Sequence, residues 1–570
     1  MIYEEENEMR KIVVVEAVST GANYIADIIK RGYEPVNLEL ILDPNSKFYK
    51  ELLFFRESAR EKYPCNPVTI EECANYEETL EKVRELDPVL VIPGSEFGVE
   101  LATRLADDLG LPGNPYKNID MYIKKSAMHA ALINAGVRGI RGRLVKTYEE
   151  ACEFMKEIGS ENIVVKPTRS AASQGIKLCQ SAAEVKEGFD AIKGKENLYG
   201  KIVDEVLIQE RIFGTEYVVN TMSRDGRHKV LSIWKYSKVK TDEGGNIYNY
   251  MESVDKLEIG HSELVEYAFS VLDALGIKDG PVHGEYMIDK DGPVLIEVNC
   301  RVMGASFFPG FLDEVSGHHE TDVILDAFLD KDHFLKHLED PYRLLRKGFV
   351  KFFITPKEID VEATPAPVIL NHLQSLYRYS LGDTSDHFHL TKTEDLETSS
   401  GMIYLVHDDA EVTKRECELL HLLETNYFRM LFHGTGKKET PPDENALSIA
   451  DAVRIVNPVG CSLIVSDLGD IPKGIQCVAP GELDRALSDY DQVFFALSSY
   501  GEGHEVETTV QAIFDAMEKV KYGGRLIVPE VFYQLIPYGR ALIEALLTIG
   551  GFRIEAPTYD RRCLVIGKRV

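Results

Sequence analysis

The stretch "PVHGEYMIDKDGPVLIEVNCRV", residues 281–302, decides how the middle of this chain folds. Apolar and polar residues alternate on both sides of a central Asp-Gly dipeptide, which is typical of tight hairpin turns, so two antiparallel strands are predicted. In the second strand Glu297, Asn299 and Arg301 share one face, because successive side chains of a strand point to opposite sides of the sheet. Glu285 lies nearly as far before the turn as Glu297 lies after it, and we expect the two carboxylates to face each other.

This polar face has the chemistry of a metal and phosphate site. Carboxylate and amide oxygens are hard ligands that suit Mg²⁺, which completes its shell with water and phosphate. A neighbouring guanidinium can neutralise oxygen charge that develops during phosphoryl transfer. His283 shares its face with Glu285, whereas Cys300 falls on the apolar side, where we interpret it as a packing residue and not a nucleophile. A solvated strand face with a surface ion pair gives the same pattern, and the hairpin alone does not decide between the two.

Length and composition describe a multidomain globular protein. The 570 residues exceed what one core holds, so about three or four domains are expected. Hydrophobic residues make up 44% and charged residues 28%, which is an ordinary globular composition. The 93 acidic residues outnumber 64 basic ones, and a field of the resulting charge, −29, repels nucleic acid and anionic membranes. Neither is therefore an expected partner.

The chain also has the features of a cytoplasmic protein. Its nine cysteines are scattered and form no CxxC pair, as expected in a reducing compartment. The first residues, MIYEEENEMR, are unlike a signal peptide, and no apolar run approaches the ~20 residues that cross a bilayer. We therefore expect a cytoplasmic location and no membrane association.

Four regions follow from the pattern of strands and helices. Residues 11–120 alternate strand-like and helical runs, which predicts a doubly wound α/β domain with functional loops, "STG" (19–21) and "PGSE" (93–96), at strand ends. The middle of the chain is predicted to be an α+β body with an antiparallel sheet. A Gly-, Pro- and charge-rich linker over 432–446 then precedes the short strands of a second α/β domain, the first being "DAVRIVNP" (451–458). The predicted domains are 11–120, 121–345, 346–435 and 446–570.

Phosphate-binding features lie upstream of the hairpin. Lys166 ends the predicted strand "ENIVVKP" (161–167) and precedes a Ser-, Ala- and Gly-rich loop whose backbone N–H groups can approach oxyanions. The loop is not a Walker motif, since GxxxxGK[ST] is absent. A predicted helix over 121–137 adds Lys125, and "LIQERIFGTEY" (207–217) fits a strand and hinge that bond a base through the backbone and a ribose through a carboxylate. Each feature alone also fits an ordinary hairpin, a surface lysine or an edge strand.

With these features in this order, the chain resembles the ATP-grasp enzymes. It is closest to the L-amino acid ligases, through phrases such as "GSEFGVELATRLADDLGLPGN", "KSAMHAALINAGV", "VVKPTRSAASQGI", "WKYSK" and "GMIYLVHDD", and the resemblance covers residues 11 to about 435. It implies an ATP-grasp fold behind a Rossmann-like N-terminal domain, with ATP and a pair of Mg²⁺ ions as cofactors and Mn²⁺ as a substitute metal. The implied reaction joins a small-molecule carboxylate and an amine, amino acids or small peptides, through an acyl phosphate and releases ADP and phosphate.

The resemblance also implies roles for matching positions of this sequence. Ala172 stands where the mobile loop of relatives often has glycine, which stiffens the loop without removing a ligand. His283 is expected to touch the substrate carbonyl, or else to be a hydrogen-bonded core histidine. The implied metal ligands are Glu285, Glu297 and Asn299, the catalytic groups are Arg301, Lys166 and His283, and the substrate contacts are Ser95, Glu96, Arg301 and Gly304. The implied ATP contacts are Lys125, Lys166, Ser170, Ala171, Ser173, Gln174, Gly175, Gln209, Glu210, Ile212 and Glu216.

Two other functions stay open at this point. The first is a different ATP-grasp reaction, such as biotin-type carboxylation or purine-pathway amide formation. The second is a scaffold protein that keeps an ATP-binding fold and recruits a partner. The intact lysine, acids, asparagine and arginine of the predicted site argue against a scaffold.

The region after about residue 435 resembles a truncated class I methyltransferase fold, with a closing hairpin in "GGFRIEAPTYDRRCLVIGKR" (550–569). "IVNPVGCSL" (455–463) stands where a GxGxG cofactor loop is needed, and its single glycine predicts that S-adenosylmethionine does not bind. We expect a degenerate Rossmann-like domain that serves assembly, substrate channelling or dimerisation, so a homodimer is expected as well. "SSYGEGHE" (498–505) is suited to a ligand, or is a plain surface loop.

Overall fold

The computed structural model forms two compact units, residues 1–347 and 348–570, each of which is described by itself. The described residues are 9–570 except 43, 45–46, 63–66, 168–174, 197–201, 241–245, 256–260, 364–365, 382–387, 395, 397, 427–432, 435–447, 457–459, 469–471, 473–474, 487, 498–503, 530–531, 533–539 and 556–563. Outside them lie Ser170, Ala171, Ala172, Ser173 and Gln174, most of the predicted linker 432–446 and most of 498–505. Within the described residues, every helix is too short or too polar to span a bilayer.

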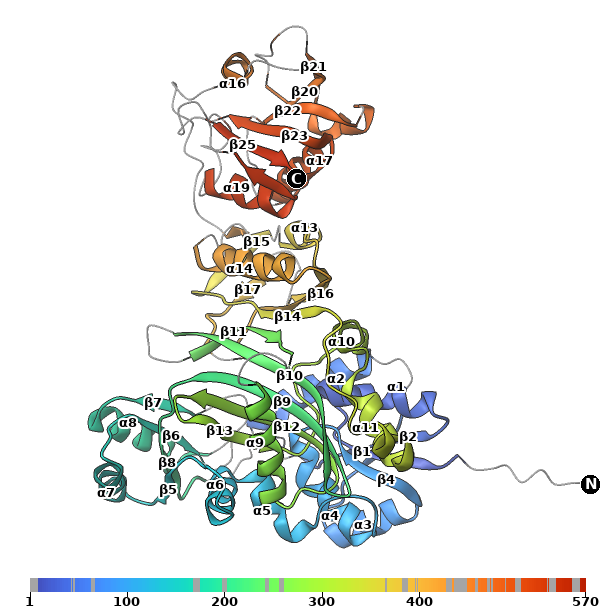
Figure 1. The fold of residues 1–570 in the computed structure, drawn as a ribbon, viewed down its shortest axis with the longest axis vertical. Helices are drawn as coiled ribbons and strands as arrows, with labels where there is room; N and C mark the ends of the chain where they lie inside the picture. The colour runs from blue at the N-terminus through green and yellow to red at the C-terminus, as the bar shows by residue number, and fades with distance from the viewer. Residues whose placement is uncertain are drawn as a thin grey trace, which may run out of the picture. The chain divides into compact units, whose positions relative to one another are not determined.

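A parallel four-stranded sheet forms the N-terminal part of the first unit (Figure 1). Its strands pair in the order β3-β2-β1-β4, all parallel, which confirms the predicted doubly wound pattern. Apolar side chains of the strands pack against Leu101 and Leu105 of α4. The elements are β1 (Lys11–Val15), α1 (Asn23–Lys30), β2 (Glu34–Glu39), α2 (Lys47–Lys62), β3 (Val68–Glu71), α3 (Tyr76–Arg84), β4 (Pro88–Pro93) and α4 (Val99–Asp108).

Two loops meet where the neighbouring strands β1 and β4 end. The first contains the 3-10 helix η1 (Ser19–Ala22), and the second runs into η2 (Glu96–Gly98). A Cβ atom on Gly21 would lie 1.7 Å from the carbonyl oxygen of Gly94, so glycine is needed for this close approach. The loops predicted to be functional therefore lie together at the carboxyl edge of the sheet, where ligands of such folds bind.

The predicted hairpin is the edge of a larger antiparallel sheet in the first unit. Its strands follow the order β13-β12-β9-β10-β11, and Glu285 pairs with Glu297 as expected. The β9–β10 turn has positive φ at both Asp225 and Gly226, 52° and 71°, as that dipeptide predicts. Cys300 is 8% exposed in the core under α9, which confirms its interpretation as packing. The elements are β9 (Thr215–Arg224), β10 (Arg227–Lys240), β11 (Asn246–Ser253), α9 (His261–Ala274), β12 (Gly280–Asp289) and β13 (Gly292–Asn299).

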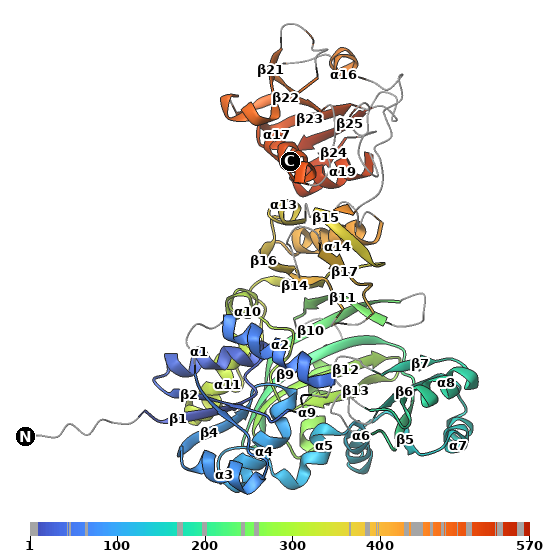
Figure 2. The same cartoon turned by 180° about the vertical axis from the view of Figure 1, so that it is seen from behind.

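A smaller antiparallel sheet, β5-β8-β6-β7, forms a lobe of the first unit (Figure 2). Helices α7 and α8 bury one of its faces over a core that includes Val165, Val206 and Ile208. Because side chains alternate along a strand, Lys166 and Gln209 lie on the opposite face. The elements are β5 (Gly142–Val145), α7 (Tyr148–Ile158), β6 (Ile163–Pro167), β7 (Lys177–Cys179), α8 (Ala182–Ile192) and β8 (Val206–Glu210).

The sequence predicts one helix over 121–137, but the structure has two. They are α5 (Ile119–Ile123) and α6 (Lys125–Asn134), separated at Lys124, whose φ of −118° and ψ of 113° are extended. Tertiary contacts override helix propensity here, since the break places Lys125 in the first turn of α6, where its ammonium reaches the polar face of the hairpin.

Three short helices follow the hairpin, and the middle one is tied to α1. Arg31, the C-cap residue of α1, donates to Asp322 at 2.9 Å. His319, at the start of the middle helix, bonds to Asp27 on α1 at 3.2 Å and to Asp313 at 2.8 Å. Asp27, His319 and Asp322 offer ligand atoms within 4.8 Å of one another, but cationic partners already neutralise these carboxylates, so the cluster is structural. The helices are α10 (Pro309–Ser316), α11 (Glu320–Leu329) and α12 (Lys331–Lys336).

The variant His319→Gln is expected to lose on the order of 2–3 kcal/mol of stability at pH 6 and little near pH 10. Burial opposes the charged imidazole, but hydrogen bonds with Asp27 and Asp313 raise the pKa of His319 to about 9. A raised pKa contributes stability that is complete below the unfolded value of about 6.5 and is lost as pH rises through about 9. Urea unfolding of both proteins at the two pH values measures the difference. Equal losses at both would show that the imidazole carries no charge.

The second unit begins with strands β14, β18 and β16 as neighbours and a three-stranded sheet, β17-β15-β19. The strand predicted in 401–409 is present as β18. Lys351 and Glu424 form an ion pair in which both side chains are fully buried. The elements are β14 (Lys347–Phe352), β15 (Ile359–Ala363), α13 (Ala366–Leu370), β16 (Leu376–Leu381), β17 (Phe388–Leu390), β18 (Gly401–His407), α14 (Ala410–Asn426) and β19 (His433–Gly434).

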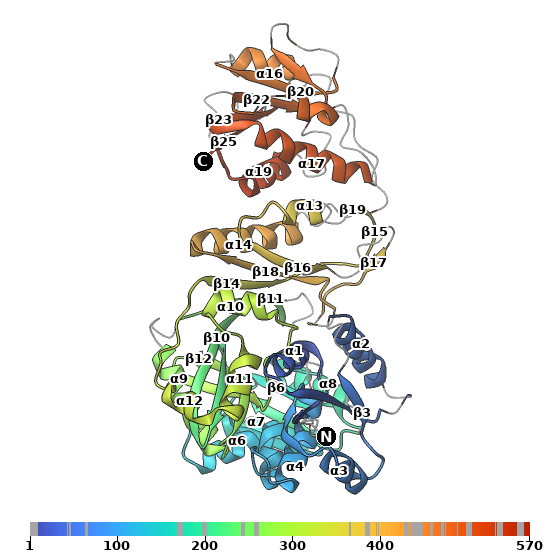
Figure 3. The same ribbon diagram turned by 90° about the vertical axis from the view of Figure 1, so that its right-hand side faces the viewer.

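A mixed six-stranded sheet forms the C-terminal part of the second unit (Figure 3). Strands β21, β20, β22 and β23 are parallel neighbours, and the antiparallel hairpin predicted in 550–569 completes the sheet as β25 and β24. The elements are α16 (Ile449–Val456), β20 (Ser462–Ser466), β21 (Gln476–Val478), η4 (Pro480–Arg485), β22 (Tyr490–Ala496), α17 (His504–Glu518), β23 (Val520–Pro529), α19 (Arg540–Ile549), β24 (Phe552–Ile554) and β25 (Leu564–Arg569).

Two predictions for this sheet are wrong. The strand predicted at 451–458 is instead helical as far as Val456, because Ser448 and Asp451 cap the start of α16. The segment 455–463 leads into β20 and so lies at the amino end of that strand, whereas a cofactor loop follows the carboxyl end. The single glycine of this segment therefore does not indicate whether S-adenosylmethionine binds.

Candidate active site

The polar face of the β12–β13 hairpin brings the predicted metal ligands together. Glu285 lies opposite Glu297, and His283 lies opposite Asn299. The amide of Asn299 donates to Glu297 at 3.4 Å, and the ammonium of Lys125 forms an ion pair with the other oxygen of Glu297. Three oxygen-bearing side chains and a buried cation thus converge on one patch of the sheet.

Two buried lysines belong to this patch. Lys125 and Lys166 are 7% and 4% exposed. Burial disfavours the Lys125 ammonium, but the carboxylates of Glu297 and Glu96 hold its pKa above the ordinary value. For Lys166, burial and the charge of Lys125 outweigh the nearby carboxylates and lower its pKa to about 7. Lys166 is therefore the member of this pair whose charge changes near neutral pH.

Glu216, the predicted ribose contact, pairs with a lysine missed at the sequence level. Lys238 Nζ lies 2.8 and 2.9 Å from the two carboxylate oxygens of Glu216. Burial raises the pKa of Glu216 even though Lys238 opposes the shift. Burial also opposes charge on Glu285, but the bond to His283 and the nearby ammonium groups lower its pKa to about 2. Lys238 could have been found from the "WKYSK" phrase (234–238). Alternation along a strand places it on the same face as Trp234 and Tyr236.

His283 is held by a buried chain of hydrogen bonds. Its Nδ1 lies 2.8 Å from Oδ1 of Asn220, whose amide nitrogen donates to Glu320 at 2.7 Å. In this arrangement the Asn220 oxygen is an acceptor, so Nδ1 of His283 carries a proton. Its Nε2 lies 3.3 Å from Glu285. The ring is thus a hydrogen-bonded core histidine that also reaches a predicted metal ligand.

Arg301 links the end of the hairpin to the two loops that follow β1 and β4 of the parallel sheet. Its guanidinium donates to Glu96 at 3.1 Å. Ser95 is 8% exposed, and its hydroxyl finds no hydrogen-bond partner among the described residues. The carbonyl of Gly304 accepts a hydrogen bond from Thr20 at 2.8 Å. All four predicted substrate contacts therefore lie where these loops meet the end of the hairpin.

The carboxylate of the predicted adenine hinge is already occupied. Glu210 accepts hydrogen bonds from the backbone N–H and the guanidinium of Arg141 at 2.7–3.0 Å, and its own N–H donates to the Arg141 carbonyl at 2.9 Å. Ile212, two residues after Glu210, is partly exposed. Gly175, another predicted ATP contact, has φ of 70° and lies beside Pro167. Because the N–H of Glu210 is engaged as well, a base at the predicted hinge would have to bond to other backbone groups of 209–212.

A cavity of about 250 Å³ lies beside the hinge, between α6 and the small sheet. His129 and Gln209 line it at 4% and 2% exposure, and their Nε2 atoms have no hydrogen-bond partner among the described residues. The N–H of Ile140 donates to Nδ1 of His129, which puts the ring proton on Nε2. Burial and the charge of Lys166 lower the pKa of His129 to about 3, so the ring is neutral. His129 was missed, although it lies one helical turn after Lys125.

The donor set fits a hard divalent cation. Glu285, Glu297 and Asn299 offer carboxylate and amide oxygens from two adjacent strands, which is the donor type that Mg²⁺ takes. The ammonium that pairs with Glu297 shows that the patch attracts positive charge. Asn299 now turns its nitrogen toward Glu297, so its amide would have to rotate to present oxygen to a cation.

Comparison with known protein families agrees with this geometry. The model described as "ATP-grasp domain" matches residues 159–309, a range that holds Lys166, the hinge and the hairpin acids. The chain contains an ATP-grasp domain. The protein is an ATP-grasp enzyme, and Lys125 and the parallel sheet precede the matched segment.

Relatives extend the likeness beyond the ATP-grasp domain. Dapdiamide A synthase of Enterobacter agglomerans is 26% identical over 430 residues, which cover 74% of this chain and 98% of that protein. The crystal structure of L-amino acid ligase from Bacillus licheniformis has a TM-score of 0.56 at 16% identity and covers 75% of this chain and 99% of that one. Carboxyaminoimidazole ribonucleotide synthase from Aspergillus clavatus, solved with ATP, has a TM-score of 0.53 at 13% identity over 73% of this chain and 99% of that one. About a quarter of the chain lies outside each match.

Proposed function

We propose that this protein is an ATP-dependent carboxylate–amine ligase that forms an amide between an amino acid, or a related carboxylate, and a second amine. The observation that carries the proposal is the convergence of Glu285, Glu297 and Asn299 on the paired strands of the hairpin, with buried Lys166 near the two acids and Arg301 two residues beyond Asn299. Cations and metal ligands of this kind suit a triphosphate, and the arginine adjoins the loops that suit a second substrate. The names of two similar proteins, dapdiamide A synthase and L-amino acid ligase, support amide formation.

The proposed reaction has two steps. A carboxylate oxygen of the first substrate attacks the γ-phosphorus of ATP, the bond from that phosphorus to the bridging oxygen breaks, and ADP leaves behind an acyl phosphate. The amine of the second substrate then attacks the acyl carbonyl, loses a proton and expels phosphate, which leaves an amide. The protein contributes mainly positioning and electrostatics to both steps.

The cationic side chains would divide the phosphate charge among them. Lys125, Lys166 and Lys238 surround the acidic patch, and we assign them to the triphosphate. Arg301 is held by Glu96, so its guanidinium is already oriented when the acyl phosphate forms next to it. The Glu96 carboxylate can in turn hold the ammonium of an incoming amine.

The hairpin acids would hold the metal. Glu285, Glu297 and Asn299 are the ligands that we propose for Mg²⁺, which when bound would offset the negative charge of the phosphates. His283, whose Nδ1 proton is fixed by Asn220, presents Nε2 on the same side as Glu285. A hydrogen bond from Nε2 to the substrate carbonyl would need a proton on Nε2 as well, because a carbonyl oxygen only accepts.

ADP release on amino acids, taken singly and in pairs, tests the proposal, with mass spectrometry of the products. The expected result is release that requires both a carboxylate and an amine and yields a new amide. Release with bicarbonate, or with a ribonucleotide amine only, would instead assign the site to a carboxylase or a purine-type ligase. No stimulation by any carboxylate and amine would rule out the ligase.

Binding of MgATP at pH 8 is expected to take up about one proton, and binding at pH 6 far less. The lowered pKa of Lys166, about 7, leaves this amine mostly neutral at pH 8 and charged at pH 6. A triphosphate favours the ammonium, so the neutral lysine gains a proton as the nucleotide binds. Calorimetry in two buffers of different ionisation enthalpy counts the protons. Lys166→Met should abolish the uptake, whereas Lys186→Met, on the exposed face of α8, should keep it.

For the C-terminal sheet we propose a role in assembly or substrate channelling without methyl transfer. A GxGxG cofactor motif would be expected soon after the carboxyl end of β20. In the sequence there, Gly469 is followed by Ile471 and Lys473 at the positions of the second and third glycines. Calorimetry with S-adenosylmethionine is therefore expected to show no binding. A dissociation constant in the micromolar range would contradict the degenerate interpretation. Light scattering of the full chain would test the homodimer, which is part of the same proposal.

A further inference from the structure

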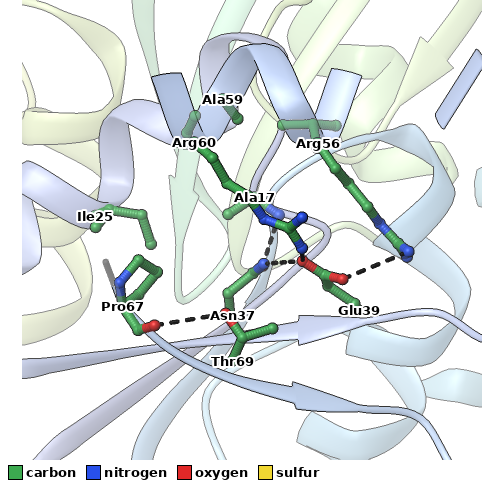
Figure 4. A pocket seen from close by; sticks show the side chains of 11 residues that line it. Ala17, Ile25, Asn37, Glu39, Arg56, Ala59, Arg60, Pro67 and Thr69 are labelled. Atoms are coloured by element: carbon green, nitrogen blue, oxygen red, sulfur yellow. Dashed lines mark hydrogen bonds and ion pairs between the residues drawn. The ribbon is translucent and has the colours of Figure 1, made fainter. Parts of the chain in front are cut away.

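A second cavity lies in the parallel-sheet part of the first unit. It encloses about 310 Å³, within the range of about 300–1,000 Å³ typical of small-ligand pockets. Figure 4 shows it between Arg56, Ala59 and Arg60 of helix α2 and the strand residues Asn37, Glu39 and Thr69. The turn after β1 lines it at the carboxyl end of that strand, where doubly wound folds bind ligands, and the proposed ligase reaction uses none of the lining residues.

One wall of the cavity is charged. Arg60 on α2 donates to Glu39 at 2.7 Å, and Asn37 donates to the same carboxylate at 3.2 Å (Figure 4). Arg56 is 8% exposed and is held by Glu16 and Glu39. The Arg60 side chain is 56% exposed, so its guanidinium is the charged group of this wall that a ligand reaches most easily.

The rest of the lining is small and apolar. It includes Ala17 and Val18 from the turn after β1, Ile25 from α1, Ala59 from α2 and Pro67 from the approach to β3. These side chains are too short to fill the space in front of the ion pair. The cavity therefore combines a guanidinium, a carboxylate and an apolar surface within one small volume.

We propose that this cavity binds a free α-amino acid with an apolar side chain. The ligand carboxylate would pair with Arg60 in the two-pronged manner that guanidinium groups favour, and its ammonium would pair with Glu39. The ligand side chain would cover the apolar wall. Arg60 and Glu39 form an ion pair with no net charge. A bound zwitterion would replace it by two ion pairs, one with each residue, and would leave no charge unpaired. This ligand class follows from the cavity and does not rest on the ligase reaction.

The turn that lines the cavity also holds the loop beyond the hairpin. Val18 contacts the cavity, and the next residue, Ser19, has φ of 55° and accepts a hydrogen bond from the N–H of Ser306 at 3.0 Å. Thr20 accepts one from the N–H of Phe307 at 3.0 Å. A bound amino acid thus contacts the same turn that fixes the substrate end of the candidate active site. Occupancy of the cavity should therefore change the KM for the carboxylate substrate.

Calorimetric binding of L-leucine and L-phenylalanine to the full chain, without ATP, tests the site. Ala59→Phe fills the cavity, and Arg60→Met removes the guanidinium. Each is expected to weaken binding at least about tenfold. 4-Methylpentanoate lacks the ammonium and 3-methylbutylamine lacks the carboxylate, and each should bind at least about tenfold more weakly than leucine.

Two matched variants separate the cavity from general effects on the helix surface. Ser58→Phe adds the same ring at an exposed neighbouring position of α2, and Arg84→Met removes an exposed guanidinium from α3. Both are expected to bind leucine like the wild type. Failure of the wild type to bind either amino acid overturns the site, as does equal binding by Ala59→Phe and Ser58→Phe. Equal binding of leucine and 4-methylpentanoate overturns the ligand class.

The effect on catalysis is measured separately. Leucine should shift the KM for the carboxylate substrate in Ser58→Phe and leave it unchanged in Ala59→Phe. An identical response of both variants would overturn the connection to the active site. Because binding is measured without ATP, its outcome is independent of whether the ligase reaction itself is found.

Discussion

Glu297→Ala should lower ADP release by at least about 10²–10³-fold. The substitution removes one carboxylate of the proposed metal site, and with it the carboxylate that forms an ion pair with the buried ammonium of Lys125. Both effects weaken the hold on a metal–triphosphate complex. Steady-state ADP release, measured over a range of Mg²⁺ concentrations, is the readout.

The matched control for this loss is Glu157→Ala. Glu157 lies on α7 in an exposed pair with Arg143, so its removal should leave activity within twofold. Glu297→Gln should recover part of the activity at high Mg²⁺, since the amide keeps one oxygen ligand. Activity of Glu297→Ala within a fewfold of the wild type would show that the metal ligands are assigned to the wrong residues.

Arg301→Lys should lower kcat about 10²-fold while the KM for ATP changes less than threefold. Lysine keeps the charge but loses the planar fork that Glu96 and the Val302 carbonyl hold in place. If Arg301 contacts the acyl phosphate, its replacement destabilises the transition state and leaves the binding of ATP unchanged. Initial rates with both substrates varied separate the two constants.

The matched control here is Arg84→Lys, on the exposed surface of α3. It should leave both constants unchanged. A large rise in the KM for ATP with an unchanged kcat in Arg301→Lys would show that Arg301 contacts the nucleotide and not the acyl phosphate.

Much of the fold follows from local pattern. Alternation around an Asp-Gly turn predicts the β12–β13 hairpin, but regular pairing counted from that turn would set Glu285 opposite Ile296. A register shift between Glu285 and Tyr286, which alternation does not predict, sets Glu285 opposite Glu297. Local pattern fails for two different reasons. Tertiary contacts break the predicted helix at Lys124, where helix propensity gives no signal. The helix at 451–456 depends instead on a local cap at Ser448, which lies just outside the apolar run.

The candidate site divides in a similar way. Glu297 and Asn299 alternate along β13, and Glu285 lies on the strand joined to it by one short turn, so local pattern is enough to find them. His129, Lys238 and Glu320 come from three separate elements, and their part in the site depends on which elements pack together. Lys125 is predicted to contact phosphate, and its ion pair with Glu297, which joins a helix to a strand far away in the chain, could not be predicted from the sequence pattern.

Arg141 immediately precedes the first strand of the small lobe, and Glu210 ends its last strand. Their reciprocal hydrogen bonds bring the points where the chain enters and leaves the lobe to one place. The lobe keeps its own core between these points. Because the core residues of the lobe all lie within 145–208, a change in the orientation of the lobe about this junction would leave that core intact.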